Sequence, residues 1–88
     1  MRSRVYSVAI VIEAGGPLVH SASVELNDAD YDLLATHLKR AFDSGAILEY
    51  EVRPLDARAP YSLEEYASNY YQEIPFLKQF ISGRKRWR

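Results

Sequence analysis

The 88-residue sequence is long enough for one domain with a thin core, because a chain of this size buries about two-thirds of its extended surface. Apolar residues make up 48 % and charged residues 26 %, an ordinary globular composition that excludes a wholly disordered chain. There is no cysteine, which excludes disulfide frameworks, cysteine-ligated zinc and thiol catalysis. With only two histidines we expect no metal site, and no motif points to a cofactor.

The net charge of −1 conceals a strong separation of charge along the chain. Residues 5–83 hold all twelve acidic residues but only five basic ones, a net charge of −7, and the two ends together carry +6. Four cationic residues adjoin one indole at the C-terminal end, and these five residues are predicted to bind a polyanion: Arg84, Lys85, Arg86, Trp87 and Arg88. Two alternatives stay open. The basic tail binds nucleic acid or an anionic membrane surface, or it has no binding role and either folds back onto its own acidic body or is only a solvated end.

Residues 4–13 and 18–26 predict a β-hairpin. The first segment is rich in β-branched residues, the second alternates, and the intervening Ala-Gly-Gly-Pro favours a tight turn. Because the first segment is apolar on both faces, it is expected to be the central strand. Its apolar run, residues 5–12, is too short for a signal peptide or a membrane helix, so we expect a cytoplasmic protein.

A helix follows the hairpin, with Asn27 or Asp28 as its N-cap and Gly45 at its C-terminal end. Apolar residues recur there at helical spacing. The predicted buried stripe consists of Tyr31, Leu34, Leu38, Ala41 and Phe42.

A third strand is predicted over residues 46–53, and Pro54 ends it. Strand alternation places Ile47 on the outer side. The residues expected to face the core are Ala46, Leu48, Tyr50 and Val52.

A second helix begins at Ser62, which forms a capping box with Glu65. Its predicted amphipathic seam consists of Leu63, Ala67, Tyr70, Ile74, Leu77 and Ile81. Pro75 interrupts that seam, so the helix must kink there or restart with the proline in its first turn.

These elements predict an α+β two-layer sandwich in the order ββαβα. A three-stranded antiparallel sheet in the order 2-1-3 is expected, with two helices on one face and exposed edges. Residues 1–83 are predicted to form a single domain, and residues 84–88 a basic C-terminal tail.

No pattern of residues indicates catalysis. His20 lies on the apolar side of its strand and His37 beside the helix stripe, and no nucleophile or acid stands at a recognisable spacing from either. We expect no catalytic residue. A small hydrolase or ribonuclease that uses one of these histidines with Arg and Tyr is kept as a minor alternative.

Tyrosine is unusually frequent, with seven in the chain, four of them within residues 61–71. Tyrosine is enriched at interfaces because it combines a large contact area with a polar tip. The predicted partner-binding residues are Tyr61, Tyr66, Tyr71 and Phe76. The alternative is a broad buried stripe that packs against the sheet.

The sequence therefore predicts a non-enzymatic protein–protein interaction module, either a homo-oligomer or a small subunit of a larger assembly. Binding of nucleic acid through the basic ends is the leading alternative.

Overall fold

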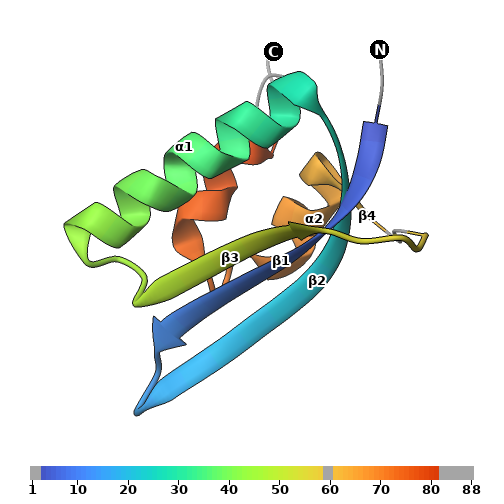
Figure 1. Cartoon of the computed structure of the whole chain (residues 1–88). Coiled ribbons are helices and arrows are strands. Elements are labelled where there is room, and N and C mark those ends of the chain that lie inside the picture. Colours follow the sequence, from blue (N-terminus) through green and yellow to red (C-terminus); the bar gives the residue numbers. More distant parts are fainter. Residues whose placement is uncertain (1–2, 59–60, 82–88) are drawn as a thin grey trace.

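A computed structural model describes residues 3–58 and 61–81 of the chain. It is an α+β structure in which a four-stranded sheet carries its helices on one side (Figure 1). The elements are β1 (Ser3–Glu13), β2 (Pro17–Asn27), α1 (Asp28–Ser44), β3 (Glu49–Pro54), β4 (Tyr61–Ser62), α2 (Leu63–Tyr70) and the 3₁₀ helix η1 (Pro75–Phe80).

The predicted hairpin is present and long. β1 and β2 pair antiparallel over their whole length, from Ser3 opposite Asn27 to Glu13 opposite Pro17. Gly15 and Gly16 turn the chain with φ angles of 78° and 139°, which side chains other than glycine rarely allow. β1 also pairs antiparallel with β3, so it is flanked on both sides, as its two apolar faces predict.

The predicted strand order, 2-1-3, is incomplete. The sheet has the order β3-β1-β2-β4, and the added strand β4 runs parallel to β2, so the sheet is mixed. β4 has only two residues, Tyr61 and Ser62, and these pair with Val24 and Glu25. A strand this short has no alternation that a sequence pattern could reveal.

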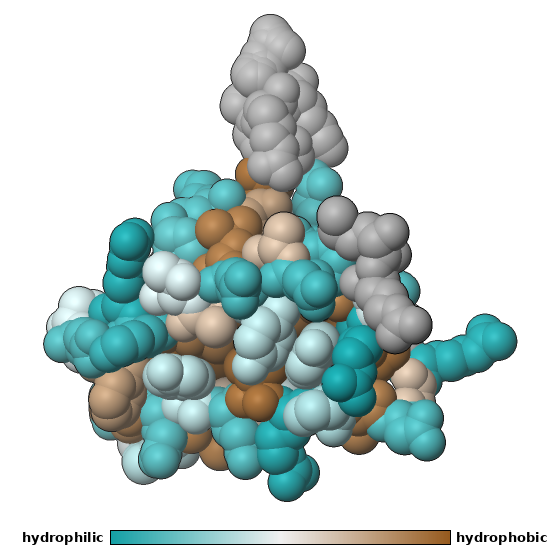
Figure 2. Space-filling model, turned by 45° about the horizontal axis from the view of Figure 1, so that its top comes forward, coloured by the Kyte–Doolittle hydropathy of each residue, from teal (hydrophilic) through white to brown (hydrophobic). Residues whose placement is uncertain are grey.

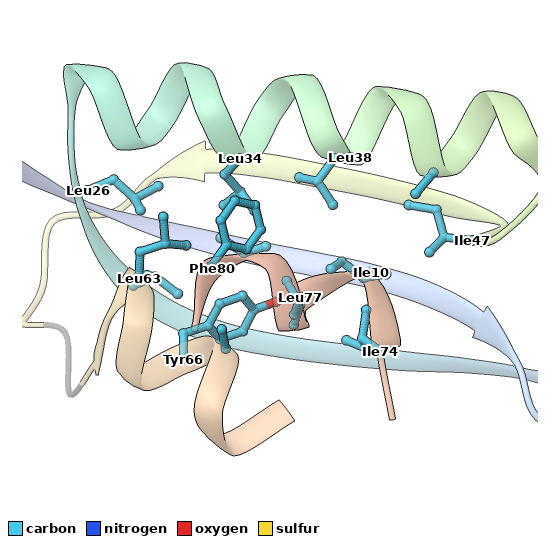
Figure 3. Close-up of a cluster of buried hydrophobic side chains, with 14 residues drawn as sticks. Ile10, Leu26, Leu34, Leu38, Ile47, Leu63, Tyr66, Ile74, Leu77 and Phe80 are labelled. Atoms are coloured by element: carbon cyan, nitrogen blue, oxygen red, sulfur yellow. The ribbon is translucent and has the colours of Figure 1, made fainter. Parts of the chain in front are cut away.

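One face of the sheet carries the core. Every buried strand residue has an even number: Val8, Ile10, Val24 and Leu26. Figure 3 shows labelled side chains from α1, α2, η1 and the sheet converging in the space between them. The odd-numbered face has no buried side chain among the described residues, so the structure has two layers and one open sheet face.

Helix α1 is capped as its sequence predicts. The Asn27 side chain accepts a hydrogen bond of 2.8 Å from the Asp30 backbone N–H. At the other end Gly45 is left-handed, and the Ala46 N–H donates to the Ala41 carbonyl at 2.8 Å. The predicted stripe is too broad, however, because Phe42 is exposed and contacts Tyr50 edge-on.

The C-terminal cap of α1 also explains why the third strand starts later than residue 46, where the sequence predicts it. The Ile47 N–H also donates to the Ala41 carbonyl, so the chain is still leaving the helix at residues 46 and 47. β3 therefore starts at Glu49, and Ile47 is buried whereas Ala46 and Leu48 are exposed. The prediction for Tyr50 and Val52, which pack against the core, is confirmed.

The second helical region restarts at its proline. α2 ends at Tyr70, and η1 begins with Pro75 in its first turn, where the missing N–H costs no hydrogen bond. The capping box of α2 is complete, with Ser62 and Glu65 bonded reciprocally at 3.2 and 3.0 Å. In the described part of the chain, no helix is long and apolar enough to cross a membrane.

Candidate interaction surface

The direction of the backbone groups in β1 shows which edges of the sheet are unpaired. The Val5 and Val11 carbonyls accept hydrogen bonds from Leu55 and Leu48, on the β3 side of β1. Because backbone groups alternate along a strand, the even-numbered residues of β1 point toward β2. In the observed register these pair with even-numbered residues of β2, so the odd-numbered residues of β2 direct their backbone groups outward.

One section of β2 therefore has an unpaired edge. β4 pairs only with Val24 and Glu25, and no other described strand adjoins β2 on that side. Residues 17–23, here called the free β2 segment, present the outward N–H and C=O groups of Val19 and Ser21 to solvent. The segment contains no Asp, Glu, Lys or Arg, and Val19 is 61 % exposed.

A group of rings adjoins this segment on the helical face of the sheet. The rings of His20 and Tyr70 meet edge to face with centroids 6.1 Å apart. The Tyr70 ring in turn contacts Tyr61 at 6.0 Å and Tyr66 at 5.3 Å. These four residues are called the aromatic cluster, and they join the free β2 segment to β4 and α2.

The side chains of the aromatic cluster differ in how far they are buried. Tyr66 is 1 % exposed, and its burial raises the pKa of its hydroxyl far above the usual value. The pKa of the Tyr70 hydroxyl is also raised. The main cause is its hydrogen bond with Tyr61, and the second cause is partial burial. Tyr61, Tyr70 and His20 are only partly buried, so their rings reach the surface while Tyr66 supports them from inside.

His20 has an unusual environment. It lies opposite Ile10 in the hairpin, and its buried Nε2 has no hydrogen-bond partner in the described structure. A buried polar atom without a partner is uncommon and costly. No described carboxylate or hydroxyl contacts this nitrogen as an acid–base partner would, and His37 packs edge-on against Phe80 instead.

The four predicted partner-binding residues do not form one patch. Tyr61 belongs to the aromatic cluster, and Tyr66 lies in the core, where its ring is not available to a partner. Tyr71 is half-buried beneath the Lys78 ammonium, which lies 5.9 Å from its ring centroid. Phe76 is half-buried beside Phe80.

Phe76 also lines a small apolar cleft of about 280 Å³. Ile12, Ile47 and Ile74 line it too, so the cleft lies at the hairpin end of the sheet, on the helical face. A cleft of this size falls just below the range typical of small-molecule sites. No group of three potential metal ligands occurs among residues 3–58 and 61–81.

The described residues on the face shown in Figure 2 form no continuous hydrophobic surface. In Figure 2, where the upper side of Figure 1 is turned forward, hydrophobic residues appear as separate patches surrounded by hydrophilic ones. Phe42 and Leu33 are the large exposed apolar residues of α1. The predicted polyanion-binding residues, Arg84, Lys85, Arg86, Trp87 and Arg88, lie outside the described residues.

The clustering of tyrosines in the sequence points to Tyr61 and Tyr71, which are half-buried, but it does not reveal the ring that connects Tyr61 to the sheet. Tyr70 was assigned to the buried seam, yet it joins Tyr61 to His20. The signal that was available is the tyrosine spacing, since Tyr66 and Tyr70 stand one helical turn apart.

Comparison with known proteins gives no relative for this arrangement: no family model, no curated protein and no solved structure matches the chain.

Proposed function

We propose that this protein is a small non-enzymatic association module that binds a protein partner through the free β2 segment and the adjoining aromatic cluster. The observation that carries the proposal is a neutral, unpaired strand edge next to half-exposed rings. Backbone groups at such an edge supply hydrogen bonds to an added strand, and neighbouring side chains supply selectivity. Tyr61 and Tyr70 offer large rigid contact areas with polar tips.

The test is an amide NMR spectrum of the isotope-labelled full chain, recorded in buffer and in a concentrated unlabelled extract of the source organism. The proposal predicts that signals of the free β2 segment, Tyr61 and Tyr70 shift or broaden, either with the chain's own concentration or in the extract. Signals of the outer face of α1, such as Thr36, serve as the internal control. Unchanged signals at the free β2 segment under both conditions would contradict it.

Nucleic-acid binding is the second candidate, and the charge distribution favours it. The ends carry +6 while residues 5–83 carry −7, and four cations cluster in residues 84–88. If those four cations contact phosphates, the log–log salt dependence of binding has a slope of roughly −3 to −4. Removal of residues 84–88 would abolish that binding and leave the melting temperature unchanged. Absence of salt-dependent binding to any DNA or RNA would remove this candidate.

A further inference from the structure

The free β2 segment fits one partner in particular. Resting on the proposed function, we infer that the protein forms a homodimer in which the free β2 segments of two copies pair antiparallel around a two-fold axis at His20. The two sheets then join into one continuous sheet. The alternative partners, a different protein or the chain's own tail, are outcomes of the experiments below.

The register follows from the direction of the backbone groups. Four residues of the free β2 segment have odd numbers, but Pro17 has no N–H and Ser23 adjoins the β4 pair at Val24. Val19 and Ser21 are therefore the two that offer both an N–H and a C=O to an added strand. Antiparallel pairing centred on His20 places Val19 opposite Ser21 of the other copy, and the two-fold axis repeats that pair. Val19 and Ser21 of each copy are then hydrogen-bonded, with four bonds at these two residues, and the β2–β4 pairs at Val24 and Glu25 remain intact.

The charge pattern favours a second copy of this segment. Around a two-fold axis equivalent side chains approach each other, so a charged edge strand repels its own copy. The free β2 segment has no Asp, Glu, Lys or Arg. β3, the opposite edge, carries Glu49, Glu51 and Arg53 and ends in a proline. Pairing of β3 with its own copy through its outward residues, Tyr50 and Val52, would place two Glu51 side chains directly opposite each other.

The side chains that the pairing would cover are those the monomer leaves exposed. Leu18 is 44 % exposed and Val19 is 61 % exposed, high values for apolar residues in a strand. In the proposed register Leu18 lies opposite Ala22 of the other copy, on the helical face. The two His20 rings meet at the axis, each backed by the Tyr70 ring of its own chain. The pairing thus covers the apolar end of the hairpin together with the His20 ring, which contacts the rest of the aromatic cluster through Tyr70.

A substitution at Ser21 tests the backbone pairing. Ser21→Pro removes an outward N–H that the monomer does not use, so two of the four intermolecular hydrogen bonds are lost. The dimer dissociation constant, measured by sedimentation from micromolar to millimolar chain, is expected to rise about thirty-fold, equivalent to ~2 kcal/mol. Ser21→Ala, which keeps the N–H, is the matched control and is expected to leave the constant within a few-fold.

Cysteine pairs test the register, and they decide the question if Ser21→Pro does not fold. The chain has no cysteine of its own, so each introduced thiol is unique. In a mixture of Leu18→Cys and Ala22→Cys chains, the two thiols meet at a pair whose Cα atoms are about 4.5 Å apart, within disulfide range. Either variant alone places its thiols about 13 Å apart along the strand direction.

The matched control is a mixture of Glu49→Cys and Arg53→Cys chains, the equivalent positions on the β3 edge. We expect a disulfide-linked dimer in the β2 mixture only. The inference is overturned if the wild-type chain stays monomeric to millimolar concentration, if Ser21→Pro dimerises like Ser21→Ala, or if the β3 mixture cross-links as readily as the β2 mixture. If the wild type is monomeric but the extract still perturbs the free β2 segment, the proposed function survives with a different partner.

Discussion

The two edges of this sheet differ in charge, and the difference indicates which of them is open to pairing with another strand. The β3 edge carries Glu49, Glu51 and Arg53 on the open face, with an exposed Glu51–Arg53 ion pair at 3.7 Å. Pro54 is the last residue of β3. The free β2 segment has no charged residue, and its one proline, Pro17, stands at its start. Charged residues and proline are the usual means by which proteins keep an edge strand from pairing, so one edge is protected and the other is available.

The largest expected effect tests the direction of the β2 backbone groups. The Ala22 N–H points toward β1, whereas the Ser21 N–H points outward. Ala22→Pro should therefore lower the free energy of unfolding by about 3 kcal/mol, because it breaks a ladder hydrogen bond inside the hairpin. Ser21→Pro breaks no hydrogen bond between β2 and β1 and should therefore cost clearly less in the monomer. Urea unfolding of both variants checks this, and equal losses would show that the assigned directions are wrong.

A smaller effect concerns the buried ring behind the β2 edge. Burial raises the pKa of Tyr66 well above the unfolded value of about 10, so above that pH the native state binds more protons than the unfolded state. The free energy of unfolding should then fall by about 1.4 kcal/mol per pH unit above pH ~10. Tyr66→Phe should flatten this slope. Urea titrations between neutral and alkaline pH measure it, and the same slope in both proteins would refute the assignment.

The next effect in size is the loss of stability expected when the N-terminal cap of α2 is removed. Ser62 lies in β4 and caps α2 through its side-chain bond with the Glu65 N–H. Ser62→Ala should cost about 1 kcal/mol of stability, because the first turn of the helix loses a partner. Ser68→Ala, an exposed serine within the same helix, is the matched control and should be neutral or slightly stabilising. Thermal melts distinguish the two, and a neutral Ser62→Ala would show that the cap is unimportant.

The smallest effect compares single charges on the two edges. Glu51→Lys removes an exposed ion pair, so stability should change by less than about 0.5 kcal/mol and association should not change. Ser21→Lys should be equally harmless to the monomer but should weaken dimerisation several-fold, because it places a charge at the paired edge. Sedimentation of the two variants at one concentration gives the comparison. If Glu51→Lys weakened dimerisation more than Ser21→Lys, the interface would lie at β3 instead of β2.

Much of the fold could be predicted because its signals are local. The Gly15–Gly16 turn, a cap at Asn27 or Asp28 and an interruption at Pro75 each depend on the chemistry of a few neighbouring residues, although that chemistry did not decide between the two caps or between a kink and a restart. β1 was correctly assigned to the interior of the sheet because both of its faces are apolar. Ile47 was misplaced because the C-terminal cap of α1 continues two residues past Gly45, and strand alternation does not apply there.

The candidate site was harder to predict because it depends on contacts between distant segments. Tyr70 contacts His20, and Tyr61 contacts Tyr70, only when β4 adds beside β2 and α2 packs next to it. No periodicity in the sequence records a two-residue parallel strand. The tyrosine count indicated that rings would gather near residues 61–71, but it could not separate buried Tyr66 from half-exposed Tyr61.

The central claim is that the neutral β2 edge, and not the charged β3 edge, is where this protein associates. Amide hydrogen exchange of the full chain, measured by NMR at low and high concentration, tests it most directly. The outward amides are those of Val19 and Ser21 on β2 and of Tyr50 and Val52 on β3. We expect exchange to slow with concentration at Val19 and Ser21 while it stays unchanged at Tyr50 and Val52. Slowing confined to Tyr50 and Val52, or equal at both edges, would contradict it.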